Sequence, residues 1–223
     1  RLRVRRHWQA PTEAFWDGIW DGTASRDYWA RALGGFLGRS YEPLFSRHLI
    51  PGCRCLEAGC GVGQVVVALR ARGFDCYGLD FAERTIATLN SIFPEMPFIQ
   101  GDIRELPFED GFFDAYLSFG VIEHFLEGQD RMLAEAARVL RPGGCIILSV
   151  PVVNLYRRLR ALLGLYRKSA VMPFFEDCYS WEELLDLFSG AGFQVSARHY
   201  RNPVMTFVQE TPLRPLYRPV EDT

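Results

Sequence analysis

Short apolar runs alternate with longer amphipathic stretches between residues 53 and 150, and this alternation restricts the fold more than any other feature. The runs have the length and composition of strands, and the stretches between them have helical periodicity. Strands that alternate with helices form a parallel sheet covered on both faces, through right-handed crossovers. We therefore predict an α/β protein with a doubly wound, Rossmann-like sheet.

The spacing of apolar residues, and the Gly and Pro residues that end helices and strands, give the bounds of the individual elements. The predicted strands are 53–57, 74–79, 97–100, 113–118 and 145–150. The predicted helices are 64–72, 82–92, 128–140 and 180–189, the last starting with a capping box of Ser180 and Glu183. Ligands of doubly wound sheets bind at the carboxyl ends of the strands. The chemistry is therefore expected in the loops after the first four strands.

The length of 223 residues predicts one domain, because a domain typically has roughly 100–200 residues. We divide it into an N-terminal helical cap over 1–50, a cofactor-binding core over 51–150, a helical lid insertion over 151–178, and a C-terminal helix and strand hairpin over 179–223. In this hairpin, 193–200 would pair with 204–209.

Composition argues against several classes of protein. Lys and Arg total 25 against 27 for Asp and Glu, and the net charge of −2 argues against a general nucleic-acid binder. The six cysteines form no C-x-x-C pair and no zinc-finger spacing, so we expect reduced thiols, no metal and a cytoplasmic location. No apolar run approaches the ~18–20 residues of a membrane span.

The loop after the first strand contains Gly59, Gly61 and Gly63 and follows Glu57. Glycines at alternate positions allow a tight turn and bring a ligand close to the main chain and to the next helix N-terminus. A dinucleotide fingerprint would need its third glycine at position 64, which is Gln64. Glu57 would repel a pyrophosphate and suits an ammonium or sulfonium group. The loop therefore favours a cationic nucleoside, although a plain tight turn is the alternative.

Acidic residues stand at the ends of the next two strands. Asp80 lies 21 residues after Gly59, where a carboxylate can accept from both ribose hydroxyls. Asp102 can accept from an adenine amino group while Ile103 packs on the ring. Each acid has a structural alternative, since Asp80 could cap the helix that follows and Asp102 could stabilise a turn. The glycine loop and both acids at three successive strand ends together indicate a nucleoside site.

The sequence resembles the class I S-adenosylmethionine-dependent methyltransferases of the small-molecule type, such as the ubiquinone and menaquinone methyltransferases. The matching motifs, in the order of that family, are LEAGCGVG (56–63), GLDFAE (78–83), QGDIRELPF (100–108), FDAYLSFGVIEHF (113–125) and LRPGG (140–144). The resemblance implies a seven-stranded sheet with an antiparallel last strand, and S-adenosyl-L-methionine as cofactor.

The resemblance also assigns roles to residues. Glu57, Gly59, Gly61 and Gly63 would line the methionine moiety, and Asp80 would hold the ribose. The adenine would contact Phe81, Asp102 and Ile103, and the sulfonium would lie near Ser118 and Phe119. These ten residues form the predicted cofactor site.

His124 follows the fourth strand and is the candidate catalytic residue. An imidazole titrates near neutral pH and could deprotonate a hydroxyl acceptor, so we interpret His124 as a general base. In the alternative interpretation His124 only shapes the site. Glu123 beside it could orient a substrate or a metal, but the sequence offers no other convergent ligand, so we expect no metal.

The cap and the lid would form the acceptor side. Trp16, Trp20 and Tyr28, with Trp29, could wall a substrate pocket, or could simply pack in the core. The lid is basic, with Arg157, Arg158, Arg160, Arg167 and Lys168. That stretch could be a lid, an anion clamp, a surface for transient membrane contact, or a solvated helix face.

These features predict methyl transfer from S-adenosylmethionine to a small organic acceptor. A phenolic or carboxylate oxygen atom is the first expectation, and nitrogen and carbon acceptors stay open. The acceptor, the pathway and the oligomeric state are not determined by the sequence. Two other classes stay open. One is a regulatory protein that binds the nucleoside without turnover. The other is an NAD-linked oxidoreductase, which the glycine spacing and Glu57 disfavour.

Overall fold

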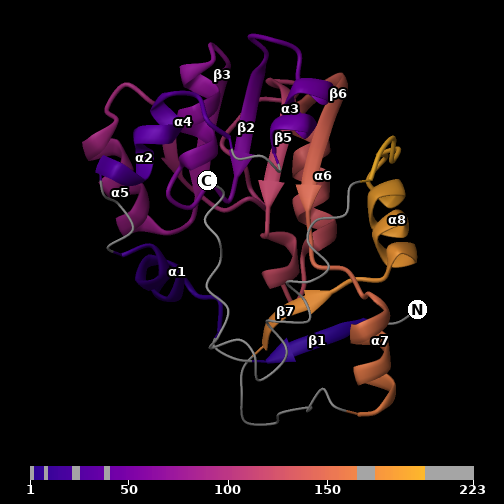
Figure 1. Ribbon diagram of the computed structural model, residues 1–223. Coiled ribbons are helices and arrows are strands. Elements are labelled where there is room, and N and C mark those ends of the chain that lie inside the picture. Colours follow the sequence, from indigo (N-terminus) through magenta and orange to yellow (C-terminus); the bar gives the residue numbers. More distant parts are fainter. Residues whose placement is uncertain (1–2, 8–9, 22–25, 38–40, 165–173, 199–223) are drawn as a thin grey trace.

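The computed structural model describes residues 3–7, 10–21, 26–37, 41–164 and 174–198. Its main sheet has five parallel strands in the order β4-β3-β2-β5-β6 (Figure 1). They are β2 (Arg54–Ala58), β3 (Asp75–Asp80), β4 (Phe98–Gln100), β5 (Phe113–Phe119) and β6 (Leu140–Ser149). The chain reverses its direction of travel across the sheet between β2 and β5, and this switch point is where doubly wound sheets bind ligands.

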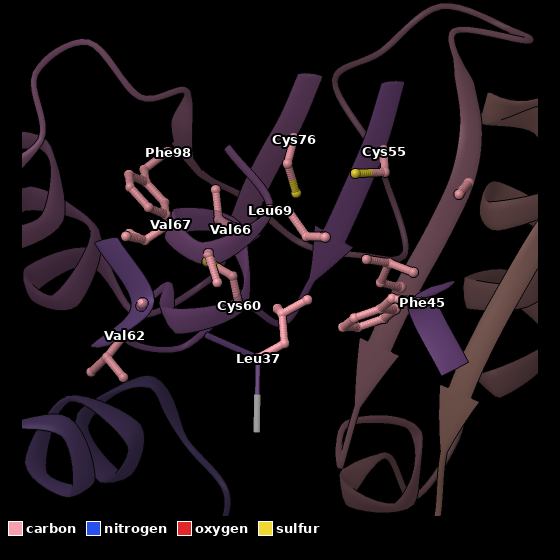
Figure 2. Close-up of a cluster of buried hydrophobic side chains, with 14 of the residues drawn as sticks. Leu37, Phe45, Cys55, Cys60, Val62, Val66, Val67, Leu69, Cys76 and Phe98 are labelled. Carbon is pink, nitrogen blue, oxygen red and sulfur yellow. The ribbon is translucent and has the colours of Figure 1, made fainter. Parts of the chain in front are cut away.

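Helices cover both faces of this sheet and enclose a separate apolar core on each side. One core packs residues of α2 (Arg26–Leu33), α3 (Glu42–His48), α4 (Gln64–Ala71) and α5 (Glu83–Ile92) on the sheet, and part of it is shown in Figure 2. The other packs α6 (Gln129–Val139) and α8 (Trp181–Gly190). Both faces are covered because the side chains of a strand alternate. In β2, Cys55 belongs to the first core and Leu56 to the second.

A second, smaller sheet lies beyond the carboxyl ends of β5 and β6 (Figure 1). It pairs β1 (Val4–His7) with β7 (Phe174–Cys178) in antiparallel register. The buried carboxylate of Asp177 accepts hydrogen bonds from Arg5 at 2.9 and 3.0 Å and from Arg3 at 3.2 Å. Burying a carboxylate is costly unless it is paired, and these two guanidinium groups supply the pairing.

The remaining elements surround the same end of the sheet. They are α1 (Glu13–Trp20), the short 3₁₀ helix η1 (Ile122–His124), and α7 (Leu155–Leu162). Tyr179 joins β7 to the segment that follows β6, because its N–H donates to Pro151 and its carbonyl accepts from Val153. The cap and the inserted segment therefore converge on the loops that were predicted to carry the chemistry.

The parallel core matches the sequence prediction, with most element boundaries shifted by one residue. The strand predicted over 145–150 begins earlier, at Leu140, because Leu140 already pairs with Phe113. The capping box at α8 is present as predicted, with the Ser180 hydroxyl accepting from the Glu183 N–H. All six cysteines lie in the described ranges and none forms a disulfide.

Three expectations about the outer segments need correction. The cap over 1–50 is not purely helical, because it contributes β1, and the lid over 151–178 contains β7 as well as α7. Residues 193–198, the start of the predicted hairpin, form no strand, and its remaining part lies outside the described residues. Five strands of the main sheet are described, so its sixth and seventh strands stay a prediction. Among the described helices, none has the length and apolar character to cross a membrane.

Candidate nucleoside and acceptor site

The glycine loop between β2 and α4 has a backbone that only glycine adopts easily. Gly59, Gly61 and Gly63 all have positive φ, at 80°, 50° and 71°. The N–H groups of Gly59 and Cys60 donate to the Leu79 carbonyl at 2.7 and 3.0 Å, which fixes the loop on the end of β3. Sequence and structure therefore agree that this turn needs glycine at each of the three positions.

The loop is also packed closely from outside. A Cβ atom on Gly59 would overlap Val121, and one on Gly61 would lie 2.9 Å from Trp20 Cζ2. The loop thus touches both the connection after β5 and the cap helix α1. These contacts bring three segments that are distant in sequence to one point.

Glu57 precedes this loop and is buried. It is hydrogen-bonded to the Val66 N–H, and its Oε2 has no hydrogen-bond partner among the described residues. Burial, together with the nearby Asp80 carboxylate, raises the pKa of Glu57 well above its ordinary value. A cationic group beside Glu57 would favour the ionised form again. A buried carboxyl group with an unused oxygen fits the ammonium group of a methionine moiety.

Asp80 stands at the end of β3 with its carboxylate turned toward the loop. Its Oδ2 accepts from the Gly61 N–H at 2.8 Å, and its Oδ1 accepts from the Ala82 N–H at 3.0 Å. Burial raises the pKa of Asp80. Asp80 precedes the N-cap of α5, which is Ala82, so its bond to Ala82 closes the turn before the helix. The Phe81 N–H also bonds to this carboxylate. A carboxylate has about four lone-pair sites, so about one further acceptor position is left for a ribose hydroxyl.

The residues predicted to contact the adenine differ in their exposure. Phe81 is 37% exposed at the end of β3, whereas Ile103 is buried in the second core. Asp102 is held by Arg104, whose Nη2 lies 2.6 Å from Oδ2 and whose N–H donates to Oδ1. This pairing lowers the pKa of Asp102. Asp102 is thus engaged within its own turn, as the structural alternative proposed, and Arg104 is a neighbour that the sequence analysis missed.

Ser118 and Phe119 end β5 and make structural contacts. The Ser118 hydroxyl donates to the Ala58 carbonyl at 2.8 Å and ties β5 to β2. The Phe119 ring lies 4.8 Å from Tyr41 and 5.9 Å from Phe45, between β5 and the cap. Both residues border the glycine loop through the strands that carry them, and their contact with a sulfonium stays a prediction.

The cap helix α1 is docked through Asp17, a buried acid that the sequence analysis did not select. Its Oδ1 accepts from the N–H and the hydroxyl of Thr85 at 3.0 and 2.9 Å, and its Oδ2 accepts from Arg84. Asp17 therefore caps the N-terminus of α5 from another helix. No local pattern marks Asp17, because its partners Arg84 and Thr85 lie on another helix.

This docking brings the predicted aromatic residues to the site. Trp16 and Trp20 stack with ring centroids 6.1 Å apart, and Trp20 covers Gly61. Tyr28 lies near Glu57 and its hydroxyl is 3.5 Å from Gln64 Oε1. Trp29 is different. It is buried in the core and donates to the Val62 carbonyl at 2.9 Å, so it supports the loop.

His124 is held in one orientation by β7. Its Nδ1 lies 2.9 Å from the Phe175 carbonyl oxygen, which can only accept, so Nδ1 carries the proton and Nε2 has the lone pair. Burial lowers the pKa of His124, which favours the neutral ring. Trp16 and Phe175 pack around it, with ring centroids at 5.0 and 4.9 Å. Nε2 is thus a base in an aromatic surrounding.

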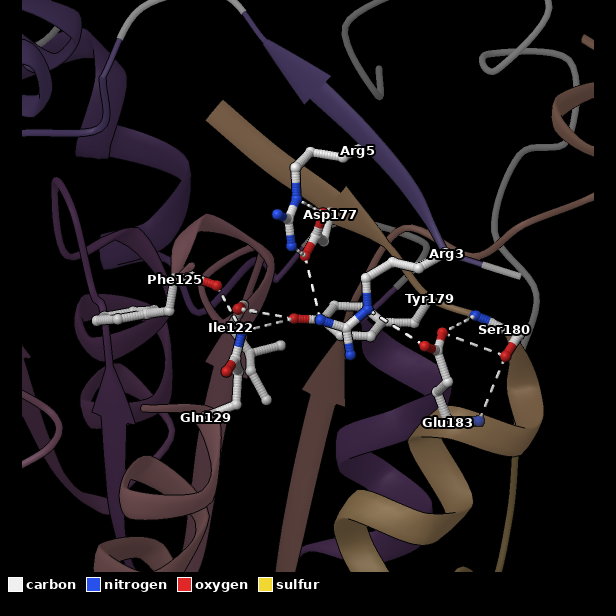
Figure 3. A network of polar contacts seen from close by, with 9 residues as sticks. All are labelled: Arg3, Arg5, Ile122, Phe125, Gln129, Asp177, Tyr179, Ser180 and Glu183. Carbon is white, nitrogen blue, oxygen red and sulfur yellow. Dashed lines mark hydrogen bonds and ion pairs between the residues drawn. The ribbon is translucent and has the colours of Figure 1, made fainter. Parts of the chain in front are cut away.

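The 3₁₀ turn that carries His124 is held by hydrogen bonds from Tyr179 and Gln129 (Figure 3). The Tyr179 hydroxyl donates to the Ile122 carbonyl at 3.2 Å, and the Gln129 amide donates to the Phe125 carbonyl. Glu123 is buried in this turn, with no hydrogen-bond partner for its Oε2 among the described residues. Burial, helped by Glu176, raises the pKa of Glu123 to about 8. No group of three or more potential metal ligands is found in the described part of the chain.

Comparisons with known proteins agree with this geometry. The family described as "Methyltransferase domain" matches residues 56–148. A "Probable S-adenosylmethionine-dependent methyltransferase" of Mycolicibacterium smegmatis is 32% identical over 176 residues, which is 78% of this chain and 62% of the relative. A demethylmenaquinone methyltransferase of Staphylococcus aureus is 30% identical over 169 residues, with 64% of this chain and 68% of the relative covered.

A crystal structure shows the same fold in a protein of low sequence identity. It is a SAM-dependent methyltransferase of Methanosarcina mazei, with a TM-score of 0.63, 18% identity, and coverage of 73% of this chain and 91% of the other. The first curated relatives are longer, and this chain spans 54–62% of their length.

Proposed function

Because the chain belongs to the S-adenosylmethionine-dependent methyltransferases, we propose that it transfers a methyl group from S-adenosylmethionine to a small organic acceptor. The observation that carries the proposal is the convergence of a three-glycine loop, Glu57 and Asp80 at the switch point of the sheet. The unused oxygen of buried Glu57 is best explained by a cationic ligand. A pyrophosphate-containing cofactor would be repelled there.

S-Adenosylmethionine supplies an electrophilic methyl group on a sulfonium centre. In our proposal Glu57 and the glycine loop bind its methionine moiety, and Asp80 binds the ribose. Phe81, Asp102 and Ile103 form the adenine side, with the Asp102 carboxylate shared between Arg104 and the ligand. Ser118 and Phe119 keep the end of β5 close to the sulfonium position.

We propose an oxygen atom as the acceptor because His124 presents a basic Nε2. This nitrogen would take the proton from an acceptor hydroxyl, which makes the oxygen a stronger nucleophile. The neighbouring Trp16, Trp20 and Phe175 rings would exclude water and favour a flat, apolar acceptor. The Staphylococcus aureus relative is named for an acceptor of the quinone type, which is compatible with such a pocket. The net charge of −2 supports a small molecule over a nucleic acid.

Ligand binding and turnover test the proposal separately. S-Adenosylhomocysteine should raise the melting temperature of the protein, whereas NADH should not. Release of S-adenosylhomocysteine would then be followed with phenols, carboxylic acids and amines in parallel. Turnover with phenols but not with amines supports an oxygen acceptor, and turnover with amines alone contradicts it. Tight binding without turnover across the whole panel would favour the regulatory alternative. Failure to bind S-adenosylhomocysteine would overturn the proposal itself.

A further inference from the structure

Helix α7 exposes leucines along one face. Leu155, Leu159, Leu162 and Leu163 are 73%, 50%, 72% and 72% exposed. They occupy positions i, i+4, i+7 and i+8 and therefore form a continuous stripe, the α7 leucine stripe. Single exposed apolar residues are common in soluble proteins, but four on two turns of one helix form a patch that usually has a partner.

The opposite face of α7 points inward and is polar. Arg157 is only 5% exposed, and its Nη1 donates to the Val152 carbonyl at 2.9 Å. Asn154 caps the helix by accepting from the Arg157 N–H at 2.9 Å. An ordinary surface helix buries its apolar face and exposes its charges. In α7 this arrangement is reversed, so burial within the described fold does not explain the leucines.

Basic residues flank the stripe. Arg158 is exposed on one side, and Arg160 lies on the other side, where its Nη1 contacts the Tyr156 hydroxyl at 3.1 Å. Residues 151–175 contain five Lys or Arg and no Asp or Glu, although the whole chain has a net charge of −2. Three of these five basic residues are on α7, the helix that exposes the leucines.

We propose that the α7 leucine stripe docks on the surface of an anionic lipid bilayer. Aliphatic side chains bordered by arginine match the boundary between acyl chains and anionic headgroups. Protein interfaces usually add aromatic residues at their centre, and this stripe has none. The inference rests on the proposed function in one respect, because a docked α7 would place the site near acceptors dissolved in lipid.

The position of α7 supports this connection. Val153, just before α7, donates to the Tyr179 carbonyl at 2.8 Å, and the Tyr179 hydroxyl donates to Ile122 in the turn that holds His124. Figure 1 shows α7, like β1 and β7, beyond the carboxyl ends of β5 and β6, at the end of the sheet where the site lies. A membrane contact at α7 would therefore be joined to the acceptor side by a short, hydrogen-bonded path.

Vesicle co-sedimentation tests the proposal without any need for turnover. The full chain would be mixed with vesicles of phosphatidylcholine alone, or of equal parts phosphatidylcholine and phosphatidylglycerol, at ~50 and ~500 mM NaCl. We expect binding to the anionic vesicles, weakened by salt, and little binding to neutral ones. The double variant Leu159→Glu, Leu162→Glu should reduce the partition coefficient by about tenfold or more.

Leu33→Glu is the matched control, because Leu33 is 52% exposed on α2, far from α7 in Figure 1. It should bind vesicles like the wild type. S-Adenosylhomocysteine binding, measured on each variant, shows that the fold is intact and reports separately on the proposed function. The proposal is overturned if the wild type stays in the supernatant with anionic vesicles. It is also overturned if the double variant binds these vesicles as well as Leu33→Glu does. It is also overturned if the stripe proves to mediate dimerisation, seen as a concentration-dependent mass that the double variant abolishes.

Discussion

The substitution Gly59→Ala tests whether the loop geometry is required as described. Gly59 has φ of 80°, and an alanine Cβ there would overlap Val121. The left-handed backbone alone costs an alanine about 1–2 kcal/mol. Crowding a packed position adds about 1–3 kcal/mol, and Val121 cannot yield easily because its β-branched side chain has a restricted χ1. We expect the free energy of unfolding to fall by about 2–5 kcal/mol.

Gly73→Ala separates the two contributions. Gly73 also has a positive φ, at 84°, but a Cβ there would meet nothing within 4 Å. It should therefore show only the backbone cost, about 1–2 kcal/mol. In the double variant Gly59→Ala, Val121→Ala the steric cost should disappear, so that Gly59→Ala costs no more than Gly73→Ala when Val121 is already alanine.

Urea unfolding of Gly59→Ala, Gly73→Ala, Val121→Ala and the double variant gives these free energies. Titration with S-adenosylhomocysteine gives the effect on the site. Gly59→Ala should lower the affinity for S-adenosylhomocysteine by about tenfold or more, which corresponds to about 1.4 kcal/mol of binding free energy. Gly73→Ala should leave this affinity unchanged. Equal destabilisation by Gly59→Ala and Gly73→Ala, or no rescue by Val121→Ala, would refute the reasoning.

Three further predictions concern the turn after β5. His124→Asn keeps a donor for the Phe175 carbonyl but lacks the base, so kcat should fall by about 10²–10⁴ while S-adenosylhomocysteine affinity is unchanged. Tyr179→Phe removes a hydrogen bond to the turn and should cost about 0.5–1.5 kcal/mol in urea unfolding, whereas Tyr116→Phe should cost less, since no partner is described for its buried hydroxyl. Glu123 has a pKa of about 8 in the fold against 4.5 unfolded, so the unfolded state loses its proton first. Stability should therefore fall as pH rises between these values, and Glu123→Gln should flatten that slope.

Each of these predictions has a contradicting outcome. Unchanged turnover in His124→Asn would leave that residue with a shaping role only. Equal losses in the two tyrosine variants would show that the hydroxyl at position 179 does not support the turn. A Glu123→Gln protein with the wild-type dependence on pH would place the titrating group elsewhere.

The parallel core could be predicted because its information is local. Each strand is a short apolar run, each helix has its own period, and the glycines that end β2 are visible as a motif. Most boundaries differ by one residue, but a strand begins earlier where pairing extends it beyond its apolar run. Leu140 is an example, since its pairing with Phe113 lies outside any local pattern.

The β1–β7 sheet could not be predicted in the same way. Its strands are charged, and they are stabilised by partners about 170 residues away, as for Arg5 and Asp177 with a separation of 172. Neither strand alternates apolar and polar residues cleanly, so a helical cap and lid were the simpler expectation. Only the pairing of the two segments makes the buried Asp177 carboxylate tolerable.

Site residues show the same division between local and distant information. Glu57 and the glycines were predicted from the loop motif; the structure gives the glycines positive φ and buries Glu57, and their contact with a ligand stays a prediction. The roles of Trp29 and Asp102 depended on contacts that spacing does not reveal, namely the Val62 carbonyl and Arg104. Asp17 was missed because its partners lie on another helix.

The central claim is that the carboxyl ends of β2 and β3 hold S-adenosylmethionine, with Glu57 facing its ammonium group. Isothermal titration calorimetry with S-adenosylhomocysteine measures this directly, with Glu57→Gln as the comparison. We predict one binding site per chain, and affinity reduced by about tenfold or more in Glu57→Gln, because a charge-assisted hydrogen bond contributes about 1.5–3 kcal/mol. No heat of binding with the wild type, or the same affinity in both proteins, would contradict the assignment of this carboxylate to a cationic ligand.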